Sequence, residues 1–388
     1  MKLIFAHDHR FLLDDNGSFF SPGKLNNNSF SRYLKHFSSL LILSRFEKYD
    51  ELLVGNNKIN KINSDRIKFN GFDNQSNLLN RFFKRPYYFY KMKTIIQQYD
   101  GLVVRVPSEI GFLASRVARA IDMPYVCEVV ACPEDAMNGI HGIKSKLYKP
   151  ILVNEMKKCV ENATGALYVT DSFLQNRYPC AGFVASASNV EITSTVEKPK
   201  CSTIKGKSPV KVCLIGNLDS PHKGYDTLFM ALNKISSDSE RNFIVYLVGA
   251  GNKYKQDCHL DNVEVIYTGS LTSEMILSHL DDMDIYIQPS NQEGLPRATI
   301  EAMSRALPCI VSNAGGLPEL IDDKYVHNVG DYEGLANKIL DIIDDNEEYN
   351  IQSSINLIKS KKYLSKDLST VRDEFFKKYN KEIINFKK

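Results

Sequence analysis

The stretch that decides the fold reads Pro289-Ser290-Asn291-Gln292-Glu293-Gly294-Leu295-Pro296-Arg297-Ala298-Thr299-Ile300-Glu301-Ala302-Met303-Ser304. It follows an apolar run at residues 285–288, turns at Glu293-Gly294 and continues as a helical pattern that begins near Pro296. A strand, a turn and a helix in this order predict one unit of a parallel sheet covered by helices, and proline suits the first helical turn. Ligands of such sheets bind at the carboxyl ends of the strands, so this turn is a candidate binding site.

The two carboxylates of this stretch have a spacing that suits a nucleotide-sugar. The start of a helix offers free N–H groups and a positive dipole end, which favour a pyrophosphate. Glu301 follows Glu293 by eight residues, which is about 12 Å along a helix axis. One carboxylate would accept hydrogen bonds from sugar hydroxyls and the other from ribose hydroxyls. The alternative is a helix-start carboxylate stabilised by the dipole and a solvated helix residue.

The same alternation of apolar runs and helical patterns continues along most of the chain and predicts an α/β protein with two Rossmann-like domains. In the first half we expect strands at residues 3–6, 40–43, 52–55, 102–106, 125–130 and 166–169, and helices at 111–121, 144–161 and 172–178. In the second half we expect strands at residues 210–215, 244–248, 263–267, 285–288 and 309–311, and helices at 225–235, 273–280 and 298–304.

The length of 388 residues also favours two domains, because a single core rarely grows beyond about 250 to 300 residues. We expect an N-terminal acceptor-side domain at 1–195, a polar hinge at 196–208 and a C-terminal donor domain at 209–365. Residues 366–388 form an amphipathic helical pattern with Leu368, Val371, Phe375 and Phe376 on one side. This apolar side needs a surface to cover, and we expect the helix to cross back to the N-terminal domain.

The distribution of charge and the cysteines indicate which partners the protein could bind and in which compartment it works. The net charge is +3, and residues 1–195 hold 25 Lys and Arg against 18 Asp and Glu, so the N-terminal half alone is basic. The eight cysteines are spread singly, which is typical of a reducing compartment, and we expect a cytoplasmic protein. The N-terminal apolar stretch is too short for a signal peptide, and no apolar stretch is long enough to span a membrane.

One basic segment interleaves cations with aromatic residues. It spans residues 81–91, and further lysines lie along the predicted helix at 144–161. This pattern favours peripheral contact with the inner membrane face or an anionic lipid carrier, and the alternative is core aromatics beside a solvated charged face. Nucleic acid is not expected, because no recognised binding module accompanies the pattern.

Together with the residues that follow it, Arg305 to Glu319, the deciding stretch resembles the Glu-x7-Glu region of the retaining glycosyltransferases of family 4. The resemblance implies the GT-B fold, in which two Rossmann-like domains face each other across a cleft. It also implies transfer of a sugar from a nucleotide-diphosphate donor with retention of the anomeric configuration.

The segment Gly216-Asn217-Leu218-Asp219-Ser220-Pro221-His222-Lys223-Gly224-Tyr225 resembles the first loop of that family's donor domain. There an arginine and, six residues later, a lysine bind the donor phosphates. Lys223 matches the lysine, but Asn217 stands where the arginine is usual, so His222 or a residue of the other domain would replace that charge. Taken alone, Lys223 could equally be a surface lysine.

Two glycine turns complete the resemblance in the second half, Val248-Gly249-Ala250-Gly251 and Tyr267-Thr268-Gly269-Ser270-Leu271. Glycine permits close backbone approach to a ligand, although a tight strand-to-helix turn would also explain both. The resemblance makes Glu293 and Lys223 the catalytic candidates. The donor-binding candidates are Gly216, Asn217, His222, Lys223, Gly249, Leu271, Glu293, Gly294, Leu295, Pro296 and Glu301.

The first half resembles the family less clearly. Ser21-Pro22-Gly23-Lys24 stands where the family has a glycine-rich loop after the first strand, although the paired glycines are absent, and Gly23 is a donor-phosphate candidate. Asp135 lies where many relatives place a histidine that faces the sugar. Gly23 and Asp135 are the acceptor-side candidates. Glu128 is a further polar candidate or, alternatively, a satisfied core carboxylate.

No metal site is expected. His7-Asp8-His9 has no third ligand and favours a polar loop. Asp282 and Asp284 spell the Asp-x-Asp of another glycosyltransferase fold, but here they end a helix and enter a strand.

The sequence therefore predicts a metal-independent glycosyltransferase of the hexosyltransferase type, with no cofactor besides its nucleotide-diphosphate sugar. The expected acceptor is a hydroxyl of a bacterial-type surface glycan or a lipid-linked glycan. Two alternatives stay open, a GT-B nucleotide-sugar epimerase and a non-catalytic nucleotide-sugar-binding subunit.

Overall fold

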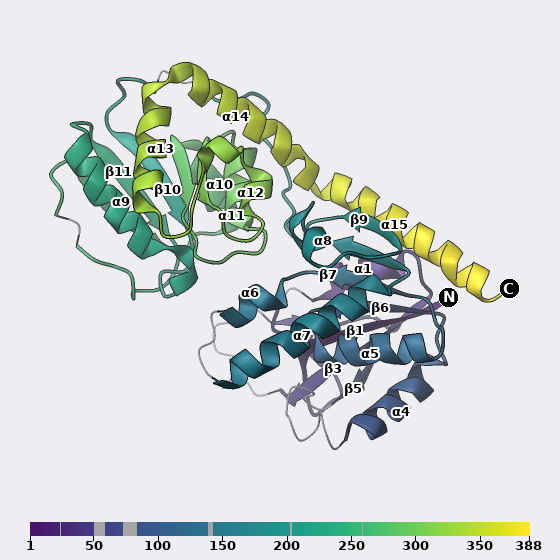
Figure 1. Cartoon of the computed structure of the whole chain (residues 1–388). Helices are drawn as coiled ribbons and strands as arrows, with labels where there is room; N and C mark the ends of the chain where they lie inside the picture. The colour runs from purple at the N-terminus through teal and green to yellow at the C-terminus, as the bar shows by residue number, and fades with distance from the viewer. Residues whose placement is uncertain (24, 50–58, 73–83, 139–142, 202–203, 258) are drawn as a thin grey trace. The chain divides into compact units, whose positions relative to one another are not determined.

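The structure is a computed structural model that describes the chain except residues 24, 50–58, 73–83, 139–142, 202–203 and 258. The chain forms two compact units, whose helices and strands are labelled in Figure 1. The first unit contains Met1–Ala187 and Ser369–Lys388, and the second contains Ser188–Leu368. The chain therefore passes between the units twice. Residues 196–208, which we expected to be a hinge, belong to the second unit.

The first unit is built on a nine-stranded sheet whose parallel part has the order β5-β3-β1-β6-β7-β8-β9. Along β1, Ile4 and Ala6 join one buried cluster of side chains while Leu3 and Phe5 are buried outside it, as expected for a sheet covered on both faces. The ladder between β1 and β3 shifts between Ala6 and Arg10, so residues 7–9 leave the regular register. The strands are β1 (Lys2–Leu13), β2 (Phe19–Ser21), β3 (Ser39–Lys48), β4 (Asn60–Lys61), β5 (Ile67–Gly71), β6 (Gly101–Val106), β7 (Tyr125–Val129), β8 (Gly165–Tyr168) and β9 (Phe183–Ser186).

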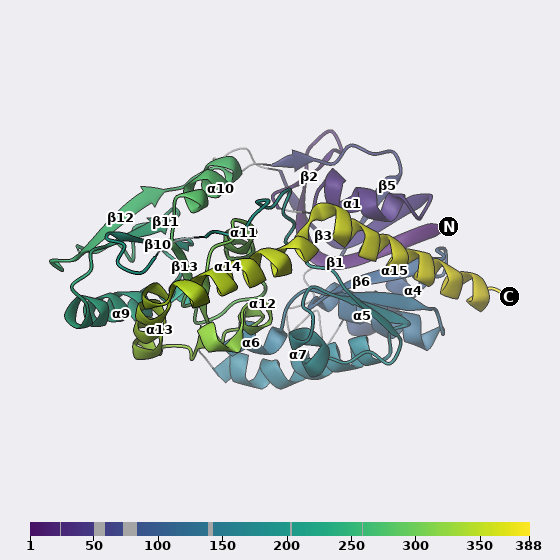
Figure 2. The ribbon, with the colours of Figure 1, turned by 90° about the horizontal axis from the view of Figure 1, so that it is seen from above.

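Helices cover both faces of this sheet, with α4, α5 and α7 on one face (Figure 2). The other face carries α1 and the part of α15 that begins at Ser369. The Phe376 ring lies 5.3 Å from the Tyr33 ring of α1, and the Phe375 ring lies 5.0 Å from the Phe183 ring of β9. The Tyr379 hydroxyl accepts a hydrogen bond of 2.7 Å from Leu102 N of β6. The helices are α1 (Asn27–Leu34), α4 (Arg85–Ile96), α5 (Glu109–Ala120), α6 (Pro133–Asn138), α7 (Ile143–Glu161), α8 (Phe173–Arg177) and α15 (Ser365–Phe386).

The second unit is built on a six-stranded parallel sheet of order β12-β11-β10-β13-β14-β15. Within this unit α9 lies beside α13, and α11 lies beside α14. The strands are β10 (Val210–Ile215), β11 (Phe243–Val248), β12 (Val263–Gly269), β13 (Ile285–Gln288), β14 (Cys309–Ser312) and β15 (Val326–His327). The helices are η1 (Pro221–Lys223), α9 (Tyr225–Asp238), α10 (Ser273–Asp281), α11 (Arg297–Ser304), α12 (Leu317–Leu320), η2 (Asp323–Tyr325), α13 (Tyr332–Asp344), α14 (Asn346–Ser360) and η3 (Lys361–Tyr363).

The predicted strands compare well with the observed ones. All five that we expected after residue 209 are present as β10 to β14, and five of the first half are present as β1, β3, β6, β7 and β8. The strand expected at 52–55 lies outside the described residues. The sequence did not predict β2, β4, β5, β9 or β15. Among the helices that the structure describes, none is long and apolar enough to cross a bilayer.

Candidate active site

The carboxylate of Glu293 is held at the end of the central strand β13. The Lys223 ammonium donates a hydrogen bond of 2.5 Å to Glu293 Oε1, and the Ser290 hydroxyl donates one of 3.0 Å to the same oxygen. Only 22% of the Lys223 side chain and 13% of the Glu293 side chain are exposed. Lys223 is therefore not a solvated surface lysine, and the structure brings the two catalytic candidates into direct contact.

The loop after β10 positions Lys223 by packing its stem over Gly216. A Cβ atom on Gly216 would come within 3.0 Å of Lys223 Cγ and Cδ, so a larger residue there would displace the lysine. The Gly216 carbonyl is fixed in turn by a hydrogen bond of 3.0 Å from the Tyr225 hydroxyl.

The loops after β10 and β13 are locked together through their backbones. Asn291 N donates to the His222 carbonyl at 2.8 Å, and Asn291 Nδ2 donates to the Pro221 carbonyl at 3.0 Å. Gly224 has a φ of 73°, and a Cβ atom there would overlap the Pro289 carbonyl oxygen at 1.8 Å. Only glycine suits this position, because it adopts positive φ without strain and adds no atom.

The glycine turn after β11 lies against the same loop. Gly249 N donates to the Gly269 carbonyl at 2.9 Å, and Leu218 N donates to the Ala250 carbonyl at 2.7 Å. The carboxyl ends of β10, β11 and β12 are thus joined. Leu271, just beyond β12, is partly buried against the core of the unit. These contacts explain the glycines structurally, and their contact with a ligand stays a prediction.

Beyond Glu293 the chain turns into α11, whose N-cap is Pro296. A Cβ atom on Gly294 would meet nothing within 4 Å, so the space beside this residue is open. Leu295 is partly buried and Pro296 is buried, and the first turn of α11 contains no acidic residue. A helix start whose first turn contains no negative side chain is suited to an anion.

Two side chains of α11 are less exposed than the sequence indicated. Glu301 has 9% of its side chain exposed and lies 3.5 Å from Arg297 NH1, so it is not a solvated helix residue. Thr299 is completely buried, and its hydroxyl has no hydrogen-bond partner within the described part of the chain. We did not predict Thr299, because a threonine in a helical pattern carries no signal of its own.

Asn217 does not supply the missing charge of the donor loop. Its side chain accepts a hydrogen bond of 2.7 Å from Asp219 N, so it shapes the loop. Asp219 accepts bonds from Asn252 N and Lys253 N at 2.8 and 2.9 Å, and these backbone donors lower the pKa of its carboxyl. The side chain of His222 is exposed.

The acceptor-side candidates lie in the first unit and have structural partners. Asp135 forms an ion pair of 2.8 Å with Arg177, whose guanidinium also lies over the Phe173 ring. A Cβ atom on Gly23 would come within 3.2 Å of His9 Cε1. Neither position is refuted as an acceptor contact, and both stay predictions.

Glu128 is a satisfied buried carboxylate of β7. It accepts hydrogen bonds from the Tyr33 hydroxyl at 2.6 Å and from Arg105 and Arg32 at 2.9 and 3.3 Å. Burial alone would raise the pKa of Glu128, but the two arginines and the tyrosine outweigh it and lower the pKa below its usual value. This is the second of the two alternatives that the sequence left open for this residue.

The residues that resemble metal ligands have other partners. Asp8 accepts bonds of 2.5 and 3.3 Å from the first N–H groups of α5, and His9 bonds the Ser21 hydroxyl at 2.9 Å. Asp284 accepts bonds from Lys207 Nζ and Lys211 N. Within the described residues no group of three or more His, Cys, Asp or Glu side chains could hold a metal ion.

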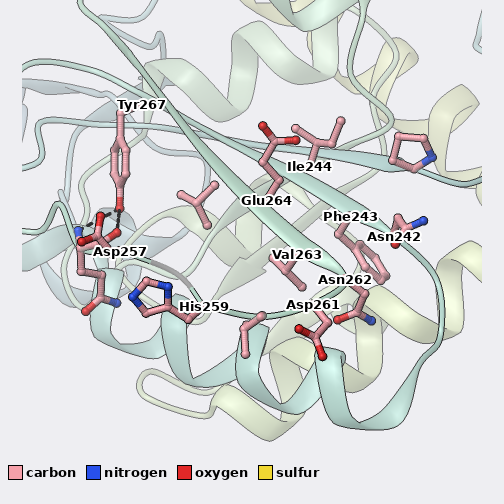
Figure 3. A pocket seen from close by; sticks show the side chains of 14 residues that line it. Asn242, Phe243, Ile244, Asp257, His259, Asp261, Asn262, Val263, Glu264 and Tyr267 are labelled. Atoms are coloured by element: carbon pink, nitrogen blue, oxygen red, sulfur yellow. Dashed lines mark hydrogen bonds between the residues drawn. The ribbon is translucent and has the colours of Figure 1, made fainter.

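A recess of about 690 Å³ lies elsewhere on the second unit, along the edge strand β12 (Figure 3). It is lined by the starts of β10 to β12 and the loop before β12, including Phe243, Asp257, His259 and Val263. The candidate site is at the carboxyl ends of the same strands. The recess therefore contains none of the predicted donor-binding residues.

Comparison with known proteins agrees with this architecture. A family model described as glycosyl transferases group 1 matches residues 209–345. Protein CapJ of Staphylococcus aureus is 30% identical to this chain over an alignment that covers all of the chain and 96% of CapJ. A solved lipopolysaccharide outer core galactosyltransferase, WaaB, covers the full chain with a TM-score of 0.64 at 16% identity. Alr3699/HepE of Anabaena in complex with UDP covers 98% of this chain and 100% of its own, with a TM-score of 0.61 at 18% identity.

The chain has the GT-B fold, and residues 209–345 match the domain described as glycosyl transferases group 1. It belongs to the same family as Protein CapJ, and its second unit contains the group 1 glycosyltransferase domain.

Proposed function

We propose that this chain is a retaining family 4 glycosyltransferase that transfers a hexose from a nucleotide-diphosphate donor without a metal ion. The observation that carries the proposal is the Lys223–Glu293 contact, which joins the two loops at the carboxyl ends of β10 and β13. Lys223 would bind the donor diphosphate, and Glu293 would bind the sugar. Retention and family 4 rest on the resemblance of the Glu293 to Glu301 stretch.

The chemistry needs stabilisation of the departing diphosphate. Fixed positive groups that meet charge as it develops lower the barrier without reorganisation. Lys223 supplies one full charge, and the start of α11 supplies backbone N–H groups and a dipole. In metal-dependent enzymes a divalent cation stabilises the negative charge of the leaving diphosphate. Here Lys223 and the start of α11 would do so, and the proposal therefore needs no metal ion.

The acceptor is proposed to be a hydroxyl of a bacterial surface glycan or a lipid-linked glycan. WaaB is named a lipopolysaccharide outer core galactosyltransferase. An Escherichia coli relative is named a galactosyltransferase of a diphosphoundecaprenol-linked sugar, and it is 33% identical over 20% of this chain. These names support the class of acceptor, and the identity of the donor sugar is left to experiment.

A panel of radiolabelled UDP-, GDP- and dTDP-sugars tests the activity. We expect the protein to hydrolyse one of them slowly and to release its nucleoside diphosphate. Conversion of the donor into an isomer would instead identify an epimerase. Binding of a donor with neither reaction, also in the presence of lipid-linked acceptors, would identify a non-catalytic subunit.

The proposal includes a cytoplasmic protein with peripheral contact to an anionic membrane. On α4, Tyr87 and Tyr90 are 63% and 73% exposed, next to Lys84 and Arg85 at the helix start. Exposed tyrosines beside cations suit the bilayer interface. Sedimentation with phosphatidylglycerol vesicles should fall when both tyrosines are changed to serine, and unchanged sedimentation would contradict the contact.

A further inference from the structure

A row of buried polar side chains leads through the second unit to Glu293. Tyr286 and Gln288 lie on β13 and Ser290 lies just beyond it, and all three are 0% exposed. The Tyr286 hydroxyl donates to Gln288 Oε1 at 2.5 Å, and Gln288 Nε2 donates to Ser290 Oγ at 2.8 Å. Ser290 then donates to Glu293 Oε1 at 3.0 Å.

The hydrogen bonds of this row all run in one direction. A hydroxyl has a single hydrogen, and the amide nitrogen of glutamine only donates. Since Gln288 donates to the Ser290 oxygen, the hydrogen of Ser290 is available for Glu293. The Gln288 amide is oriented with its oxygen toward the Tyr286 hydroxyl, which donates to Oε1, and with its nitrogen toward Ser290.

The side chain of Ser290 is not needed to hold its own loop. The Ser290 carbonyl accepts a bond of 2.6 Å from the Ser312 hydroxyl, and the next residue, Asn291, is tied to the loop after β10. These contacts fix the backbone independently of the Ser290 hydroxyl. The hydroxyl therefore acts mainly on the Glu293 carboxylate.

Polar side chains are costly inside a central parallel strand. A buried amide or hydroxyl is tolerated only when it is hydrogen-bonded, and an apolar side chain would serve packing better. Here both polar residues of β13 are used in one row that ends on a carboxylate. Both bonds to Glu293 fall on Oε1, and within the described residues Oε2 accepts none.

We propose that Ser290 and Gln288 are positioning residues that hold Glu293 so that Oε2 meets a hydroxyl of the donor sugar. The inference rests on the proposed function, because it assumes that Glu293 binds the sugar. Lys223 and Ser290 hold Oε1 from two sides, which fixes the plane of the carboxylate. A sugar hydroxyl would then donate to a carboxylate oxygen that is already oriented. Binding would therefore cost little conformational entropy of the Glu293 side chain.

A crystal structure of the Ser290→Ala variant tests the positioning without any ligand. We expect the Glu293 carboxylate to leave its present orientation while the backbone at residues 289–292 stays in place. Ser290→Thr keeps the hydroxyl and should retain the orientation. A carboxylate that is unmoved in Ser290→Ala would overturn the inference.

Calorimetry tests the consequence for the sugar. The donor is the nucleotide-sugar of the panel that binds most tightly. The measured quantity is the ratio of the affinity for this nucleotide-sugar to the affinity for its free nucleoside diphosphate. Ser290→Ala should lower this ratio about tenfold, the effect of one hydrogen bond to a charged group, and Gln288→Leu should lower it in the same direction. Ser360→Ala removes another buried hydroxyl of this unit, which bonds only its own helix, and should leave the ratio unchanged.

A double-variant cycle separates this inference from the proposed function. If Ser290 acts through Glu293, Ser290→Ala should have almost no effect on the ratio in a Glu293→Ala background. An equal loss in both backgrounds would overturn the positioning role. A ratio unchanged by Glu293→Ala alone would instead contradict the proposed sugar contact, and the crystal structure would still decide whether Ser290 orients the carboxylate.

Discussion

Replacement of Lys223 by methionine should weaken binding of a free nucleoside diphosphate. Methionine keeps an unbranched stem that can lie over Gly216, but it removes the ammonium that donates to Glu293. Lys223 is 22% exposed, so its charge is partly shielded from solvent. One hydrogen bond between charged groups contributes about 1.5 to 3 kcal/mol, which corresponds to a loss of about 10- to 150-fold in affinity.

The assay is isothermal titration calorimetry with UDP and GDP on the intact chain. Lys234→Met is the matched control, because Lys234 lies on α9 and forms an i,i+4 ion pair of 2.8 Å with Asp238, away from the candidate site residues. We expect this control to bind like the wild type. The melting temperature of each variant should be measured beside the titrations. Lys223→Met removes one of the two hydrogen bonds that Glu293 accepts within the described residues, and we expect it to lower the free energy of unfolding by about 1 kcal/mol. Diphosphate affinity within about twofold of wild type in a folded Lys223→Met protein would refute the assignment.

Three further predictions concern the metal, the fold and pH. Activity should survive EDTA, and abolition with rescue by manganese would contradict a metal-independent mechanism. Deletion of residues 366–388 should lower the melting temperature and abolish transfer, because Phe376 and Tyr379 pack in the core of the first unit; an unchanged melting curve would contradict this role. Burial and the Arg105 guanidinium lower the pKa of His7 from 6.5 to about 3. Between pH 6.5 and about 3 the unfolded chain therefore binds a proton that the folded chain does not. The free energy of unfolding falls as the pH falls through this range, by up to about 1.4 kcal/mol per pH unit. Urea midpoints at pH 7.5 and 5 should therefore differ less in His7→Asn than in the wild type, and equal differences would count against the buried neutral histidine.

The second unit was predicted more completely than the first because its signals are local. Each strand from β10 to β14 is a short apolar run that ends at a glycine, proline or polar turn. In the first unit β5 has the sequence Ile-Lys-Phe-Asn-Gly, and its two polar residues interrupt the apolar run by which the other strands were predicted. It forms because it pairs with β3, a contact that the local pattern does not encode.

The sequence predicted which residues belong to the candidate site, but it did not predict the contacts between them. The sequence identified Lys223 and Glu293, but assigned one to the phosphates and the other to the sugar, so their direct bond was not foreseen. The strand pattern places Gln288 at the end of an apolar strand, and it does not show that the side chain donates a hydrogen bond to Ser290. The ion pair between Asp135 and Arg177 joins residues 42 positions apart, and only the fold brings them together.

The turnover of Glu293→Gln with the donor that the panel identifies tests the central claim most directly. The substitution keeps the size of the side chain and its contacts with Ser290 and Lys223, but it removes the negative charge. We predict a loss of turnover of at least about tenfold, or about 1.4 kcal/mol of transition-state stabilisation, in a protein that stays folded at the assay temperature. Turnover within about threefold of the wild type would contradict the assignment of Glu293 to the sugar and, with it, the proposed donor site.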